Sequence, residues 1–408
     1  MITLYLTMMS VGMGQTVVFA ILPMLGRELG LDQLVFQLPL GLGSIQPREL
    51  AITSLSAITA FVFFMTVPFW GRLSDRLGRK PLIIFGLFGY AVGTMVFNGV
   101  AYLGLKSLLG GSLLYLFLVL SRIFHSIIMG GTHPASAAYM VDVTTVNERT
   151  RGMGKLQAFN QLGVMVGPAL AWFAHISYLA PLFIQSAVAF LVALLVWRYL
   201  PALPVSHVST EPQKKLRYFD PRYRLLLLLG FTLYSLLGMV QQTLGFYFQD
   251  LLNIEGVEAV HFFSIAMVLS SLSMLFAQFV VVQRYTGPPM TLLRYGLPFS
   301  LLSYLLLASA DSLTGLYIAM TLFGFGMGLT GPSFSASSTL AVDGHEQGGL
   351  AGLIGAVAGL GFMAGPLIGG ALYRVSPSYP YWCAAGLMMV IMVSLFLQKK
   401  WAPSQENS

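Results

Sequence analysis

The chain has 408 residues, of which 56% are hydrophobic and only 9% are charged, and its formal net charge is +7. Soluble globular domains carry about 25% charged residues, so this composition excludes an ordinary soluble protein and requires lipid as the solvent. The single cysteine, Cys383, excludes an internal disulfide and a metal site built from several cysteines. We therefore expect no metal and no cofactor.

Apolar stretches long enough to cross a bilayer as helices recur along the whole chain. About 20 residues are needed for each crossing, and helices satisfy every backbone group in lipid. We expect an all-α membrane protein with twelve transmembrane helices in two pseudo-symmetric six-helix bundles. Glycine and proline interrupt the inner ends of the fourth and tenth spans. In chain order, the expected spans are 3–26, 49–70, 81–103, 111–138, 153–175, 179–200, 223–248, 260–283, 290–309, 312–340, 348–373 and 379–398.

Residues 122–172 and 320–370 repeat one another without a gap at an offset of 198. A repeat of this length indicates two homologous halves, which is typical of membrane transporters that hold a ligand between their halves. We predict an N-terminal bundle at 1–200, a cytoplasmic linker at 201–222 and a C-terminal bundle at 223–408.

Basic residues gather in the loops that follow even-numbered spans. Examples are Arg72, Lys155, Arg198 and Arg284, and few basic residues lie in the opposite loops. Cytoplasmic loops carry such an excess of lysine and arginine, so both termini are expected in the cytoplasm. The same placement argues against nucleic acid as the partner of the positive charge. We expect a multi-pass protein of the bacterial cytoplasmic (inner) membrane, and a monomer.

The loop after the second span reads G-R-L-S-D-R-L-G-R-K-P over residues 71–81. Gly71 and Gly78 permit a tight turn, and Asp75 can pair with the surrounding cations, including Arg76 and Arg79. This run resembles the cytoplasmic signature of the major facilitator superfamily, in particular its branch of 12-helix drug or metabolite:proton antiporters. The resemblance implies a cytoplasmic latch that holds one conformation. A basic loop that only sets topology is the alternative.

Arg122 is expected about eleven residues into the fourth span, roughly 16 Å deep. A charge at that depth costs about 2.5–3.5 kcal/mol unless it is paired or hydrated, so we expect it to face a cavity. His125 and Met129 follow on the same helix face. The segment resembles a superfamily signature in which this arginine is linked to proton coupling, but His125 and Ser126 depart from that pattern. A structural tether to backbone carbonyls is the alternative for Arg122.

The sequence G-x-x-x-G-P occurs once in each half. Small residues four apart let helices approach closely, and proline removes a backbone hydrogen bond. The first copy resembles the superfamily's antiporter motif, which implies a hinge in an exporter that exchanges with protons. Plain helix packing is the alternative. The hinge residues are Gly163, Gly167 and Pro168 in the first half and Gly361, Gly365 and Pro366 in the second.

Neutral polar side chains on membrane spans are candidates for lining a substrate cavity. Amides in membranes also act as interhelical contacts worth about 0.6 kcal/mol each, and that alternative stays open. The candidates are Gln15, Gln157, Asn160, Gln161, Tyr234, Gln241 and Gln242.

The deepest charge is the cation Arg122, and no carboxylate lies near the centre of the first, fifth, seventh, eighth or eleventh span. We therefore expect an anionic or zwitterionic cargo, such as a drug or a carboxylate metabolite or siderophore, and protons as the coupling partner. The leading hypothesis is proton-coupled efflux by alternating access. An uptake symporter for an organic acid is the alternative, and a non-transporting receptor or an enzyme is a remote one. We expect a transporter and not an enzyme.

Overall fold

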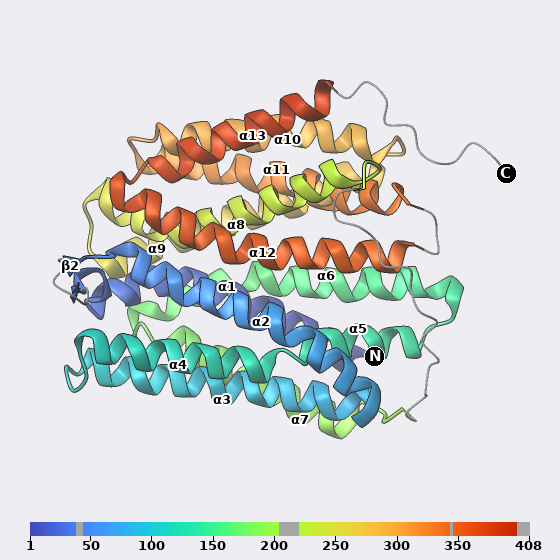
Figure 1. Ribbon diagram of the computed structural model, residues 1–408, viewed down its shortest axis with the longest axis horizontal. Helices are drawn as coiled ribbons and strands as arrows, with labels where there is room; N and C mark the ends of the chain where they lie inside the picture. The colour runs from blue at the N-terminus through green and yellow to red at the C-terminus, as the bar shows by residue number, and fades with distance from the viewer. Residues whose placement is uncertain (38–43, 204–219, 343–345, 398–408) are drawn as a thin grey trace. The chain divides into compact units, whose positions relative to one another are not determined.

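The computed structural model describes residues 1–37, 44–203, 220–342 and 346–397 (Figure 1). Most of the predicted linker at 201–222 lies outside these residues, as do residues 38–43 between the first two predicted spans. Contacts divide the chain into two compact units. The first comprises Met1–Val208 with Ile254–Ser264, and the second comprises Ser209–Asn253 with Ile265–Ser408.

Nearly all of the described chain is helical. The long helices are α1 (Ile2–Glu28), α2 (Glu49–Leu77), α3 (Arg79–Leu105), α4 (Gly111–Met129), α5 (Thr132–Asp142), α6 (Val146–Leu170), α7 (Ala180–Tyr199), α8 (Arg224–Leu252), α9 (Gly256–Phe276), α10 (Pro289–Ala308), α11 (Leu313–Thr339), α12 (Gln347–Val375) and α13 (Tyr379–Leu397). Short 3-10 segments are η1 (Leu31–Gln33), η3 (Ala171–His175) and η5 (Val282–Arg284), and η4 (Ala277–Val281) is a π-helix. In the segment between α1 and α2, β1 (Phe36–Gln37) pairs antiparallel with β2 (Ser44–Ile45).

The predicted all-α membrane fold is confirmed, and each of the twelve expected spans has a helical counterpart when α4 and α5 are taken together. Eleven stretches of the described chain are long and apolar enough to cross a membrane. The helix α6 is not among them, because Lys155, Gln157, Asn160 and Gln161 make its middle polar.

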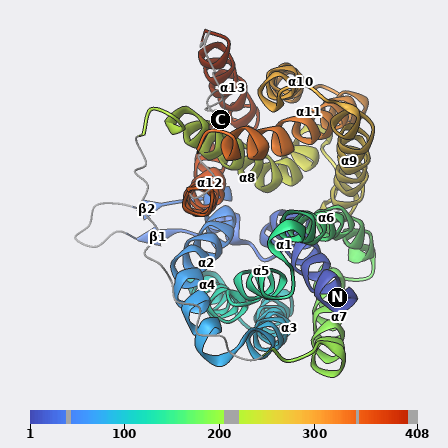
Figure 2. The same cartoon turned by 90° about the vertical axis from the view of Figure 1, so that its right-hand side faces the viewer.

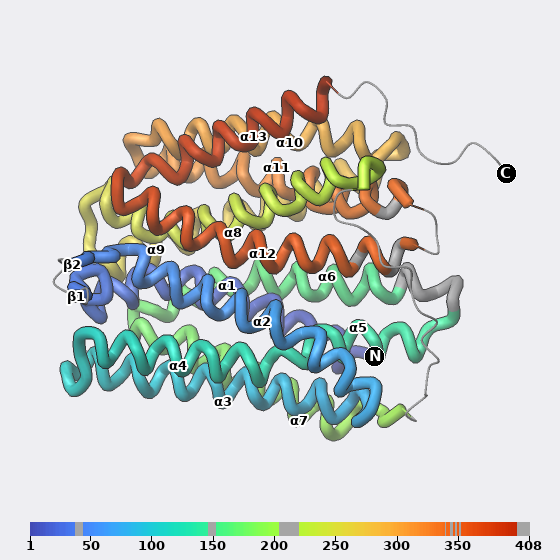
Figure 3. Tube along the Cα trace, in the orientation of Figure 1, coloured from blue at the N-terminus to red at the C-terminus, as the bar shows by residue number. Residues whose placement is uncertain are grey.

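The fourth span is not one helix. It breaks at Gly130 and Gly131, and α5 continues the chain toward Asp142 (Figure 3). A helix end leaves carbonyls without partners. Here the indole Nε1 of Trp70 donates to the carbonyl of Ile127 at 2.7 Å, so α2 satisfies one of them. The tenth span behaves differently, since α11 runs through Pro332 to Thr339 without interruption.

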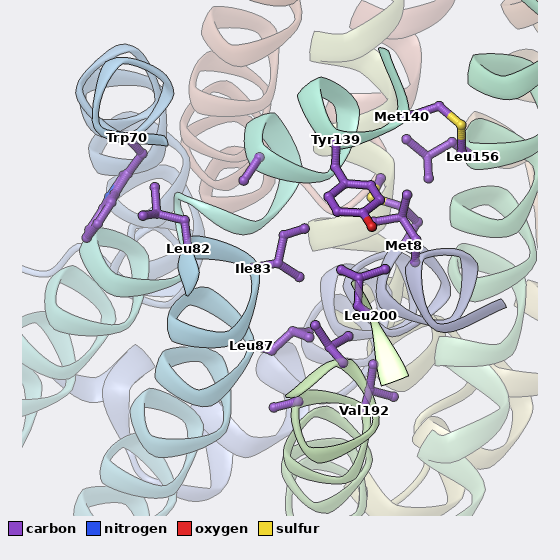
Figure 4. Packing of buried hydrophobic residues seen from close by; sticks show 14 residues of the cluster. Met8, Trp70, Leu82, Ile83, Leu87, Tyr139, Met140, Leu156, Val192 and Leu200 are labelled. Atoms are coloured by element: carbon purple, nitrogen blue, oxygen red, sulfur yellow. The ribbon is translucent and has the colours of Figure 1, made fainter. Parts of the chain in front are cut away.

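A buried apolar cluster holds one end of the first unit together (Figure 4). It draws side chains from α1, α2, α3, α5, α6 and α7, and Tyr139 lies in it with its hydroxyl donating to the carbonyl of Pro201 at 3.0 Å. Within each unit one helix pair makes the most extensive contact, α1 with α6 in the first and α8 with α12 in the second. Figure 2 shows the helices of each unit close to end-on.

Candidate functional site

Arg122 lies inside the first unit, with 6% of its surface exposed. Its Nε donates to Thr59 Oγ1 of α2 at 3.0 Å, and its guanidinium lies 5.4 Å from the ring centre of Phe97 on α3. No carboxylate comes within ion-pair distance of Arg122 in the part of the chain that the structure describes. The cation is thus held by a hydroxyl and an aromatic face, and its charge is not neutralised.

His125 follows one turn later and is also buried, at 3% exposure. Its ring lies edge-to-face against Tyr90 of α3, with ring centres 4.7 Å apart. The helices approach closely here, because a Cβ at Gly93 would come within 2.8 Å of the histidine Cα and Nδ1. Met129 is half-buried and packs against a cluster that contains Tyr90. The three coupling candidates on α4 therefore all lie against helices of the first unit.

Several residues beside Arg122 and His125 were missed by the sequence analysis. Tyr90 donates its hydroxyl to the carbonyl of Gly14 at 3.1 Å and lies beside Thr94 and Gln185. Gln185 of α7 donates to the carbonyl of Ser10 at 2.9 Å, while its Oε1 has no partner among the described residues. The amide of Asn98 is fully buried, and neither of its atoms is bonded to any residue that the structure describes. A sequence pattern could have revealed three of these residues, because Tyr90, Thr94 and Asn98 recur every four residues, on one face of the largely apolar α3.

Gly163 and Gly167, the glycines of the first predicted hinge, both lie directly against the backbone of α1. A Cβ at Gly163 would overlap the carbonyl oxygen of Met9, and one at Gly167 would come within 2.6 Å of the carbonyl oxygen of Met13. Gly12 of α1 makes the reciprocal close contact with α6, since a Cβ at Gly12 would overlap the carbonyl of Asn160. Thr16 Oγ1 bonds across the contact to the carbonyl of Val164 at 2.9 Å.

The second hinge repeats this contact against α8. A Cβ at Gly361 would lie 3.0 Å from both Phe231 O and Ser235 N, and one at Gly365 would overlap Ser235 O. The glycines match at the repeat offset of 198, and their partners on α1 and α8 match at an offset of 222. Both halves therefore use the same backbone register, which the sequence repeat alone does not reveal.

The two prolines have different consequences. After Pro168, α6 ends at Leu170 and tightens into η3, whereas α12 continues past Pro366 to Val375. In α12 the continuation includes Gly369, where a Cβ would come within 2.7 Å of Met239 Cγ. At the offset of 198, the first half has Ala171 where the second half has Gly369, and η3 begins at Ala171.

The cavity candidates fall into two groups. Gln15 and Gln157 are exposed, and Gln161 is half-buried. Asn160 is buried and donates its Nδ2 to the carbonyl of Met8 at 3.2 Å, so it acts as an interhelical contact. In the second unit, Tyr234 is half-buried beside Phe334 and Phe362. Two neighbouring amides of α8 are buried and have atoms without a partner in the described part of the chain. These atoms are the Oε1 of Gln241 and both amide atoms of Gln242.

In the motif at residues 71–81, Arg79 is the centre of the charged contacts. Its Nε donates to Asp142 Oδ2 at 3.0 Å, and its Nη1 donates to Ser74 Oγ at 2.6 Å and to Asp75. Arg76 and Asp75 are exposed. The tight turn depends on Gly78, whose φ is +92° between α2 and α3. Gly71, which we expected to share that role, lies inside α2 instead.

The second unit has a charged cluster that the sequence analysis did not predict. Arg222 bonds to Glu346 Oε2 through Nη1 at 2.7 Å and to Asp220 Oδ2 through Nη2 at 2.9 Å. The Glu346 side chain is only 8% exposed. This cluster joins the start of α8 to the start of α12, at a place unrelated to the motif of the first half.

The fold is that of a multi-pass, all-α membrane protein. The sequence matches the Major Facilitator Superfamily over residues 4–357 and 296–408. The chain belongs to this superfamily.

Characterised relatives span nearly the whole chain. Multidrug resistance protein 1 of Bacillus subtilis is 26% identical over 366 residues, covering 87% of this chain and 89% of the relative. The class C tetracycline resistance protein of Escherichia coli is 28% identical over 354 residues, covering 84% of each chain.

Solved structures share the fold at lower identity. The human organic anion transporter MFSD10 (TETRAN) superposes with a TM-score of 0.68 at 19% identity, over 96% of this chain and 98% of the other. The nucleoside transporter NupG superposes with a TM-score of 0.72 at 13% identity, over 98% and 100%.

Proposed function

We propose that this protein is a proton-coupled exporter of a small anionic or zwitterionic organic molecule, working by alternating access in the cytoplasmic membrane of a bacterium. The observation that carries the proposal is Arg122, a buried cation with no carboxylate within ion-pair distance among the described residues. An unneutralised charge inside a membrane protein is expensive, and such residues usually serve substrates or ions. An acidic group of the cargo would supply the missing counter-charge.

His125 supports proton coupling, since a histidine is the side chain whose charge changes most readily near neutral pH. It lies one turn from Arg122 and against Tyr90, so a proton on His125 and an anion at Arg122 would influence one another. Efflux is favoured by the relatives, which are described as multidrug and tetracycline resistance proteins. The two G-x-x-x-G-P segments make close backbone contacts within their own units, and the first of them resembles the superfamily's antiporter motif.

The runner-up is an uptake symporter for an organic acid, which uses Arg122 in the same way and differs only in direction. A reconstituted system separates the two. A panel of anionic metabolites and drugs is first screened for thermal stabilisation of the purified protein, because a ligand that binds the folded state raises its melting temperature. The best ligand is then loaded into proteoliposomes, and a pH jump is imposed.

We expect the ligand to move against its own concentration gradient, in the direction opposite to the proton flow. Movement of ligand and protons in the same direction would establish the symporter instead. Ligand flux that ignores the pH gradient would overturn proton coupling in either direction.

A further inference from the structure

A groove at the start of α3 is lined by Lys80, Pro81, Ile84, Phe85, Phe88, Trp197 and Ala202. These residues come from α3, from α7 and from the segment that directly follows α7, and its volume is about 580 Å³. It is a different place from the Arg122 site. Lys80 and Phe97, the ring against Arg122, are 17 residues apart on α3, or about 25 Å along the helix axis.

The walls of the groove are aromatic and outward-facing. The exposed fractions are 48% for Phe85, 47% for Phe88 and 65% for Trp197. Further rings continue this surface, because Phe88 lies 5.8 Å from Phe190 and Phe85 lies 5.4 Å from Trp70, centre to centre. On a membrane-spanning helix such a face meets acyl chains, and tryptophan prefers the level of the lipid headgroups.

The one charged residue of the lining is Lys80, and it is free. No hydrogen bond or ion pair involves it within residues 1–37, 44–203, 220–342 and 346–397. Its neighbour Arg79 differs, since Asp75 and Asp142 both bond to it. Lys80 is half-buried, lies beside an apolar groove and has no acid partner among the described residues. An anion that also carries hydrocarbon would complement both the charge and the groove.

We propose that this groove binds one anionic phospholipid of the surrounding leaflet, with its phosphate on Lys80 and the first part of its acyl chains on Phe85, Phe88 and Trp197. The groove matches the volume range of small-ligand sites, about 300–1,000 Å³, so it holds a headgroup region and not a whole lipid. Basic pockets between membrane helices on the cytoplasmic side recognise anionic headgroups in this way. The leaflet is the inner one if both termini are cytoplasmic, as the sequence predicts.

Native mass spectrometry of the full-length protein, offered phosphatidylglycerol or phosphatidylcholine with identical acyl chains, tests the proposal. We expect phosphatidylglycerol to be retained in preference to phosphatidylcholine. Lys80→Gln should lower phosphatidylglycerol retention about fivefold, the effect of one lysine near an anionic surface. Trp197→Ala should lower the retention of both lipids, because it removes apolar wall.

The matched control is Lys106→Gln, at the other end of the same helix, where Lys106 lies over the ring of Tyr102. It should leave retention unchanged. Equal retention of the two lipids by the wild type, or unchanged phosphatidylglycerol retention in Lys80→Gln, would overturn the proposal. Displacement of the lipid by millimolar inorganic phosphate would show a site for free anions and would overturn it as well. None of these results depends on the transported substrate.

Discussion

The contact between α1 and α6 and the contact between α8 and α12 share a backbone and differ in side chains. In both, two glycines four residues apart press on the same two carbonyl positions of the partner helix. Around them, the first half has Thr16 and Asn160 bonding across the contact, where the second half has Gly238 and Ala358 at the matching offsets. The glycines therefore serve the close approach itself, and the polar groups have changed independently.

The same contrast extends to charge. The first unit buries Arg122 without a carboxylate partner among the described residues, whereas the buried carboxylate of the second unit, Glu346, is paired with Arg222. If the coupling chemistry resides in the first half and the glycine contact serves both halves, substitutions at Arg122 should affect transport, whereas substitutions at the glycines should affect stability in both halves alike. The predictions below test that division, beginning with the largest expected effect.

Arg122→Ala should reduce proton-coupled transport in proteoliposomes by at least about 30-fold, because removing one partner of a buried charged contact costs about 2–5 kcal/mol. Expression and folding should stay near normal. Arg122→Lys shows whether charge alone suffices or the guanidinium fork is needed. The matched control is Arg294→Ala in α10 of the second unit, whose Nη2 donates to the carbonyl of Leu395. Normal transport by Arg122→Ala would refute the coupling role.

Gly167→Val and Gly365→Val should each destabilise the protein by about 1–3 kcal/mol, since both overpack a backbone contact. Melting temperatures of the purified variants measure this. The smaller change Gly163→Ala should cost more than Gly361→Ala, because a Cβ at Gly163 overlaps Met9 O whereas one at Gly361 meets its nearest atoms at 2.8–3.0 Å. A tolerated Gly167→Val beside a damaging Gly365→Val would break the equivalence of the two contacts.

Thr16→Val should cost only about 0.6 kcal/mol, the average for an interhelical hydrogen bond in a membrane. It removes the bond to the carbonyl of Val164 while keeping the side-chain volume. A small drop in melting temperature with transport intact is expected. Loss of transport at normal stability would give Thr16 a functional role that Gly238 in the other half cannot share.

The smallest effect should come from Asp220, where hydrogen bonds from the side chain and the backbone N–H of Arg222 lower the carboxyl pKa. A lowered folded-state pKa stabilises above the ordinary carboxyl pKa of about 4, and that stabilisation is lost as the pH falls through the lowered value. Asp220→Asn should therefore lower the melting temperature slightly at pH 7, and the difference should shrink as the pH falls below about 4 and vanish once the pH lies below the lowered pKa. Asp311→Asn, an exposed acid before α11, is the control and should have no effect at either pH.

Much of the fold could be predicted because hydropathy and length report directly on membrane helices. The limits came from local geometry. Glycine and proline indicated an interruption at the inner end of the fourth span but did not locate it at Gly130 and Gly131. The hydrogen bond from Trp70 to the carbonyl of Ile127 joins residues 57 apart and leaves no local pattern. Arg122 and His125 stood out because charge is rare in membrane spans. Tyr90 and Gln185 did not, because their importance lies in which helices face one another.

The two offsets, 198 and 222, locate the main difference in length between the two halves. The hinge glycines repeat at 198 and their partners at 222, so the first half holds 24 more residues between its first and fifth spans than the second half does. Most of the excess lies in one place. Residues 29–48, which carry η1, β1 and β2, separate α1 from α2, whereas only residues 253–255 separate α8 from α9. The segment between α1 and α2 is thus the main departure from the repeat, and shortening it would bring the spacing of the first half close to that of the second.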